Sequence, residues 1–73
     1  PRFSIHSSVS GIYADEEARA AVLAALPDEA PALAEFLEQN RRRPYSLYQL
    51  AEFSPGLLSA EQLAAIDLHL SRL

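Results

Sequence analysis

The chain has no cysteine, no lysine, no methionine and no tryptophan, and only two histidines and two glycines among its 73 residues. The lack of cysteine excludes a disulfide framework and every zinc site built on thiolates. His6 and His69 have no carboxylate cluster at ligand spacing beside them, so the sequence predicts neither a metal centre nor another cofactor. The missing methionine is consistent with removal of an initiator before Pro1 or with excision from a longer chain. Without covalent or metal cross-links, stability must come from helix packing or from burial against a partner.

Positive charge and long apolar runs are also scarce. Six arginines stand against ten carboxylates, which gives a net charge of −4 and a surface that repels phosphate backbones, so nucleic-acid binding is not expected. No apolar run approaches the roughly 20 residues that a membrane-spanning helix needs. A chain of this length buries only about 60% of its unfolded surface. It is therefore read as a single helical domain over residues 1–73, with an arm and first turn in 1–14 and a bundle in 15–73.

The most specific local pattern occurs twice. Ser46 is followed three residues later by Gln49, and Ser59 by Gln62; in both copies leucine and alanine come next. A serine followed at this spacing by glutamine forms a capping box, in which each side chain bonds a free amide of the first helical turn. The pattern predicts helix starts at residues 47 and 60.

The segment 3–9 alternates apolar and polar residues, which favours an extended arm that lays Phe3, Ile5 and Val9 on the core. One helical turn is expected at 10–13. A first long helix over 16–26 is predicted from Asp15 as N-cap and Pro27 as terminator. A second is predicted from Asp28 as N-cap, with Pro31 in its first turn, and Pro44 is expected to end it.

The third and fourth helices are predicted over 47–53 and 60–73. Apolar residues at helical spacing mark the expected core positions of all four helices: Val22, Leu23, Leu26, Leu33, Phe36, Leu37, Leu47, Leu50, Phe53, Leu63, Ile66, Leu70 and Leu73. The predicted fold class is all-α: a compact four-helix bundle with short helices and an extended N-terminal arm.

No reactive constellation is predicted. Asp67 and His69 are two residues apart on a helix and point about 200° away from each other, so they cannot act as a base and its orienting group. Carboxylates at helix starts are explained by the helix dipole. Ser46-Leu47 resembles the attachment site of acyl carrier proteins, but Tyr45 replaces the acidic residue there and Gln49 explains Ser46 as a cap. The chain is not expected to be an enzyme.

Two surface features are candidates for contact with a partner. The basic run, Arg41, Arg42 and Arg43, is flanked by Tyr45 and Tyr48 and either neutralises a helix end or meets an anionic partner. Leu68 lies about 140° around its helix from Leu63, outside the core stripe. It is either covered by the N-terminal arm or left as a contact surface.

The order of these pieces resembles a small helical module at the C-terminal ends of some bacterial carbohydrate-active hydrolases, such as β-glucosidase-like proteins. The resemblance covers most of the chain and is strongest near the C-terminus. The residues that carry it are 3–5 with Ser7, 20–23, 26–27, 46–47, 50–51, 53–59 and 63–67. It implies an accessory unit for packing or dimerisation and transfers no catalytic residue.

The predicted function is therefore contact rather than catalysis: a helical interaction or accessory module that binds a protein partner, a parent domain or a second copy of itself. The alternative is a small stand-alone regulatory protein whose basic run binds an anionic partner or nucleic acid. The predicted contact residues are Arg41, Arg42, Arg43, Tyr45, Tyr48 and Leu68.

Overall fold

The computed structural model describes residues 2–28 and 30–73, and Pro1, the first residue of the predicted arm, lies outside them. The described residues form helices and no strand, which confirms the all-α class. A separate capped helix, α1, stands where a single turn was expected, and the four predicted helices follow it. The bounds are α1 Val9–Tyr13, α2 Glu16–Ala25, α3 Pro31–Gln39, α4 Leu47–Phe53 and α5 Ala60–Ser71.

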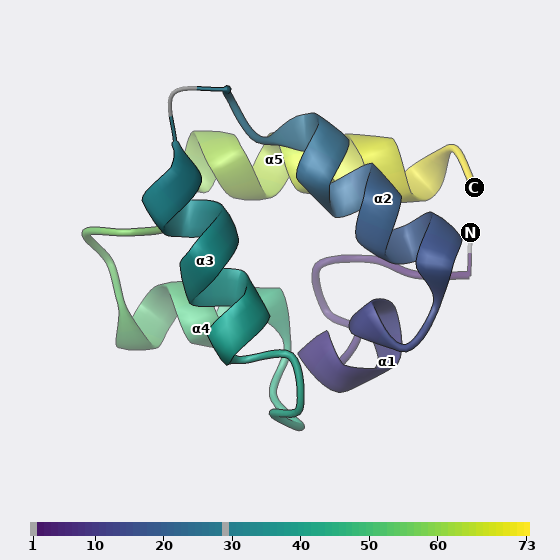
Figure 1. The fold of residues 1–73 in the computed structure, drawn as a ribbon, viewed down its shortest axis with the longest axis horizontal. Helices are drawn as coiled ribbons and strands as arrows, with labels where there is room; N and C mark the ends of the chain where they lie inside the picture. The colour runs from purple at the N-terminus through teal and green to yellow at the C-terminus, as the bar shows by residue number, and fades with distance from the viewer. Residues whose placement is uncertain (1, 29) are drawn as a thin grey trace.

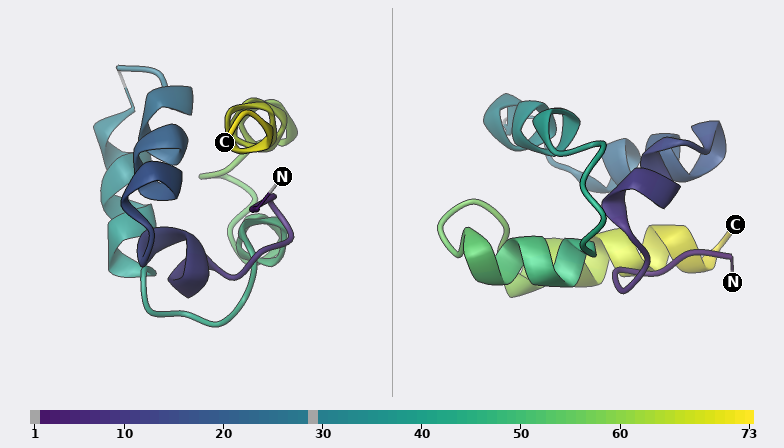
Figure 2. Two further views of the ribbon diagram at one scale, coloured as in Figure 1. Left: turned by 90° about the vertical axis from the view of Figure 1, so that its right-hand side faces the viewer. Right: turned by 90° about the horizontal axis from the view of Figure 1, so that it is seen from below.

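The helices form two layers. In Figure 2, α2 and α3 lie on one side, α4 and α5 lie on the other, and α1 sits at one end between them. The backbones approach most closely between α2 and α5, which run in opposite directions (Figure 1), and between α1 and α2. A four-helix bundle is thus not confirmed; the arrangement is a pair of helical layers closed at one end by α1.

A single core lies between the layers. Every helix contributes to it, and one residue comes from the turn before α5. Eight of its residues are less than 2% exposed, which is substantial burial for so short a chain. The core residues are Val9, Ile12, Tyr13, Ala18, Val22, Leu33, Leu37, Leu47, Leu50, Leu58, Ile66 and Leu70.

Serine and aspartate caps define four of the five helix starts. Both predicted capping boxes are confirmed: the Gln49 N–H donates to Ser46 Oγ at 3.1 Å, and the Ser46 N–H donates to Gln49 Oε1 at 2.9 Å. The pair at Ser59 has distances of 3.1 and 2.8 Å. Asp15 caps α2 as predicted by accepting from the Ala18 N–H at 3.0 Å.

The cap of α1 has a specific requirement for glycine. Ser8 accepts from the Gly11 N–H at 3.0 Å. A Cβ at position 11 would lie 2.9 Å from Ser8 Oγ, closer than real Cβ contacts. Gly11 therefore leaves room for the capping hydroxyl.

The start of α3 differs from the prediction. Asp28 is not its N-cap; α3 begins at Pro31 after Ala30, and no side chain caps it. The physical reason is that proline at the first helical position lacks an amide hydrogen and has a preset φ, so the helix can start there without a cap. The predicted ends of α2 and α5 are one and two residues too long, a difference typical of helix ends. α3 ends at Gln39 and not at Pro44, because the chain already turns at residues 40–42.

Three predicted core residues are exposed: Leu23, Leu73 and, most of all, Phe53, at 63%. Phe53 is the last residue of α4, where the chain turns away, and its ring packs edge-on against Tyr45 at 5.2 Å between centroids. Leu58, from the turn that follows, is buried at 2% exposure. The spacing of apolar residues along a helix does not show at which turn their burial ends. Phe53 was therefore wrongly assigned to the core.

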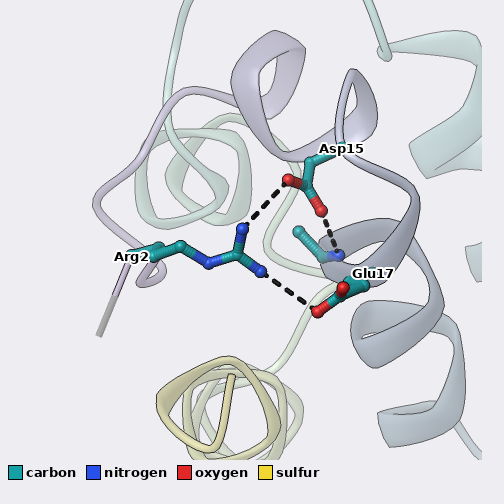
Figure 3. A network of polar contacts seen from close by, with 4 residues as sticks. Arg2, Asp15 and Glu17 are labelled. Atoms are coloured by element: carbon teal, nitrogen blue, oxygen red, sulfur yellow. Dashed lines mark hydrogen bonds and ion pairs between the residues drawn. The ribbon is translucent and has the colours of Figure 1, made fainter.

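The N-terminal arm contacts both layers. Its Phe3 and Ile5 are half-buried against the core, as predicted, whereas Val9 is fully buried within α1. The Ile5 N–H donates to Asp67 Oδ1 at 3.0 Å, so a carboxylate of α5 holds the arm. At its start, Arg2 pairs with Asp15 at 3.5 Å and with Glu17 at 3.2 Å (Figure 3).

Backbone hydrogen bonds join the arm and the start of α1 to the segment before α4. Ser8 and Ser46, the N-caps of α1 and α4, face each other in an antiparallel bridge and are 38 residues apart. The Ser10 N–H donates to the Arg43 carbonyl and the Tyr48 N–H donates to the Ile5 carbonyl, both at 3.1 Å. The two donors, Ser10 and Tyr48, are 38 residues apart, and so are the two acceptors, Ile5 and Arg43. Each of the short capped helices, α1 and α4, is followed by a longer capped helix, and these two longer helices, α2 and α5, pack together.

Candidate functional site

The basic run lies beside α1 because backbone bonds hold it there. The chain turns after α3, with the Arg43 N–H bonded to the Asn40 carbonyl at 3.0 Å, and the Arg43 carbonyl accepts from the Ser10 N–H of α1. The last turn of α3 contains no basic residue, and Asn40 Nδ2 donates to the Phe36 carbonyl at 2.8 Å. The side-chain amide of Asn40 therefore caps the C-terminal end of α3, and the basic run is not needed for this role.

The three arginines have different surroundings. Arg41 pairs with Glu38 at 2.7 Å, and Glu38 also pairs with Arg19 of α2 at 3.1 Å. Arg42 and Arg43 are exposed and form no ion pair with any residue in 2–28 or 30–73. Two of the three predicted cations thus remain available to an anion from outside.

A hollow of about 250 Å³ separates the basic run from α1. We call it the Tyr13 hollow. One side comes from α1 and its C-cap, and the other comes from the turn after α3. The residues that line it are Ser10, Tyr13, Ala14, Arg41 and Arg42.

Tyr13 has an unusual environment. Its side chain is 4% exposed, and its hydroxyl has no hydrogen-bond partner among the described residues. Burial raises the pKa of Tyr13 from 10.0 to about 12, and the negative charge of Glu38 adds to this, against the lowering effect of Arg19 and Arg41. The hydroxyl is therefore a neutral donor at physiological pH. The Arg19 guanidinium lies over the ring, 5.8 Å from its centroid.

The structure brings together only part of the predicted site. Tyr48 is 45% exposed, and its ring lies 5.2 Å from that of His6. Tyr45 packs on Phe53, and neither Tyr45 nor Tyr48 lines the hollow. The sequence-based prediction missed Ser10, Tyr13 and Ala14, because no spacing pattern reveals that α1 lies across from a turn some 30 residues further along the chain.

Leu68 is 51% exposed, so the arm does not cover it. Ala64, one turn earlier on α5, is also exposed. Six large apolar side chains of the described residues are exposed, and five of them belong to α4, to the turn after it, to α5 or to the residues that follow α5. These five are Tyr48, Phe53, Leu57, Leu68 and Leu73; the sixth, Leu23, is on α2.

The polar residues that were weighed as catalytic or attachment sites have structural roles. Asp67 holds the arm, and His69 Nδ1 lies 2.9 Å from the Ala65 carbonyl on the same helix. Ser46 is 8% exposed and caps α4. The described residues contain no group of three or more metal-ligating side chains, and none of their helices has the length and apolarity to cross a membrane.

Comparisons with models of protein families, with curated proteins and with solved structures found no match to this chain.

Proposed function

We propose that the chain is a non-catalytic helical interaction module that contacts another protein surface through the outer side of its α4–α5 layer. The observation that supports this proposal is the uneven distribution of exposed apolar side chains, five of six on that layer. The resemblance to accessory modules of carbohydrate-active hydrolases favours a parent domain as the partner, and a second copy of the chain would bury the same side chains.

Energetics favour contact at this layer over contact at the α2–α3 layer. Each Å² of apolar surface removed from water contributes about 25 cal/mol. Phe53, at 63% exposure, and Leu68, at 51%, are the two most exposed large apolar side chains. Covering them removes more apolar surface than covering Leu23, the single exposed large apolar side chain on the opposite layer.

Site-specific photo-crosslinking tests the proposal in the cells that produce the protein. A photoreactive amino acid replaces Leu68 in one variant and Leu23 in the other. Both positions are on helices and half exposed, so the two variants are matched. We expect a discrete crosslinked product, either with a second copy or with another protein, from position 68 only. Equal products at both positions, or none at position 68, would contradict the proposal.

Charge insertion provides an independent check in purified protein. Leu68→Glu and Leu23→Glu are both expected to retain the helical circular dichroism spectrum, because both side chains face solvent. Sedimentation velocity with whichever partner the crosslink identifies should show loss of the complex for Leu68→Glu and retention for Leu23→Glu. Equal weakening would place the contact elsewhere.

The basic run supports a second candidate function, binding of an anionic partner by a small regulatory protein. The observation in its favour is that Arg42 and Arg43 have no carboxylate partner among the described residues. Reversal of the three charges to glutamate should abolish such binding and leave the contact at Leu68 unchanged. Retained binding of an anionic partner after the reversal would exclude the basic run as its site.

A further inference from the structure

The Tyr13 hollow has the size of a site for a small group. Pockets for drug-sized ligands and cofactors occupy roughly 300–1,000 Å³, and a water molecule in the liquid takes about 30 Å³. A hollow of about 250 Å³ that is partly open therefore accommodates one small ionic group with some of its water.

The polar groups around the hollow are mainly hydrogen-bond donors. Arg41 and Arg42 contribute two guanidinium groups, which match the geometry of carboxylate and phosphate oxygens. Ser10 contributes a hydroxyl whose present partner, Ser8 Oγ, is 3.4 Å away, a long bond that leaves this hydroxyl available. Among the described residues, no carboxylate lines the hollow.

Carboxylates lie beside the residues that line the hollow. Glu38 pairs with Arg41 on one side, and Asp15 and Glu16 follow Ala14 directly on the other. A polyanion such as a nucleic acid would extend over these negative charges and be repelled, as the net charge of −4 also predicts. A single anionic group inside the hollow would instead contact donors from two sides.

We infer that the Tyr13 hollow is a binding site for one oxyanion, the carboxylate or phosphate group of a small ligand or of a partner's side chain. Arg42 is the main charged contact, because Arg41 already shares its charge with Glu38. Ser10 contributes a neutral donor, and the backbone bond from Ser10 to Arg43 keeps the two sides together. This inference rests on the second candidate function, and it narrows the basic run to two of its three arginines.

Titration of the ¹⁵N-labelled chain tests the site. Sodium phosphate and sodium acetate serve as probes at pH 7, with ionic strength held constant by sodium chloride. We expect saturable amide shifts at Ser10, Ala14 and Arg42, and the tighter of the two anions identifies the group that the hollow prefers. Arg42→Gln should weaken binding about fivefold or more, the fold-change expected for loss of an exposed charged contact of about 1 kcal/mol.

Arg43→Gln is the matched control. It removes the same charge from the adjacent position, but Arg43 does not line the hollow, so we expect binding within twofold of the unmodified chain. Equal weakening by Arg42→Gln and Arg43→Gln would overturn the hollow and leave the basic run as a diffuse anion-binding surface. Absence of a saturable shift with both anions would overturn the oxyanion site, and the triple charge reversal would then decide the second function separately.

Discussion

Tyr13 carries one of the two buried polar side-chain atoms that have no hydrogen-bond partner among the described residues; the other is Arg19 Nε. The Tyr13 hydroxyl is buried without a partner among the described residues, although its ring belongs to the core. A buried donor that loses its water without gaining a protein partner destabilises the folded state by about 1–3 kcal/mol. Tyr13 also lines the Tyr13 hollow, so this unfavourable energy lies in a residue of the proposed binding site.

Tyr13→Phe should therefore stabilise the chain in the absence of ligand. We expect the free energy of unfolding at pH 7, measured by urea denaturation, to rise by about 1 kcal/mol. The pH dependence should change as well. Because the pKa of Tyr13 is raised from 10.0 to about 12, the fold favours its neutral form. Below pH 10 the hydroxyl is neutral in both states and its ionisation does not affect stability. Between pH 10 and pH 12 the unfolded chain loses the Tyr13 proton before the folded chain does, so the free energy of unfolding falls by roughly 2 kcal/mol.

The difference between the two proteins isolates Tyr13, because their other groups are the same. The stability advantage of Tyr13→Phe should grow as the pH rises from 9 to 11. Parallel curves for the two proteins over this range would show that Tyr13 ionises as easily in the folded chain as in the unfolded one.

At the scale of elements, the two capping boxes are chemically alike and differ in environment. Ser46 is 8% exposed and takes part in the antiparallel bridge with Ser8, whereas Ser59 is exposed. Loss of a serine cap destabilises a protein by about 0.5–2 kcal/mol, and a buried amide left without a partner brings the loss to the upper end of this range.

Ser46→Ala should thus decrease the free energy of unfolding by about 2 kcal/mol, and Ser59→Ala by about 1 kcal/mol or less. Urea denaturation of the two variants measures both values. Each substitution removes one hydroxyl from the same four-residue pattern, so each variant controls for the other. Equal losses would mean that the deeper burial of Ser46 adds nothing to the loss of its cap.

The same elements show what local sequence can predict. The starts of α2, α4 and α5 follow from Asp15, Ser46 and Ser59, because a cap acts within one helical turn. The start of α3 was wrong because Pro31 begins it without a cap. Phe53 was misplaced because burial at a helix end depends on where the chain goes next.

The candidate site was half predictable for a related reason. The basic run is visible in the sequence as three adjacent charges. The Tyr13 side of the hollow cannot be predicted from the sequence, because backbone bonds between segments 38 residues apart hold it beside the basic run. Any residue other than proline can form such bonds, so residue types do not reveal them. Asp67 was likewise considered only as a catalytic candidate, whereas it accepts the Ile5 N–H.

At the scale of the whole molecule, the bond from Ile5 to Asp67 joins positions 62 residues apart. Asp67→Ala should leave the Ile5 amide without its acceptor and release the arm from α5. We expect a loss of about 1–2 kcal/mol in the free energy of unfolding and faster hydrogen exchange at the Ile5 amide.

Glu61→Ala provides the control for this prediction. It removes a carboxylate from an exposed position of the same helix that forms no ion pair or side-chain hydrogen bond with the described residues. Because Glu61 lies in the first turn of α5, we expect a loss of about 0.3–1 kcal/mol from the helix dipole and no change in hydrogen exchange at the Ile5 amide. Unchanged exchange at Ile5 in Asp67→Ala would indicate that the apolar contacts of Phe3 and Ile5 hold the arm without the carboxylate.

The bridge between Ser8 and Ser46 also determines the order in which the chain can fold. Helices form from local contacts within microseconds, but closing a loop of 38 residues carries an entropy loss of roughly 3 kcal/mol before its bonds form. We therefore expect individual helices to appear early during refolding and the crossing at Ser8 and Ser46 to close late. Because the same crossing holds α1 against the basic run, partly folded chains have no Tyr13 hollow, and anion binding reports completion of the fold.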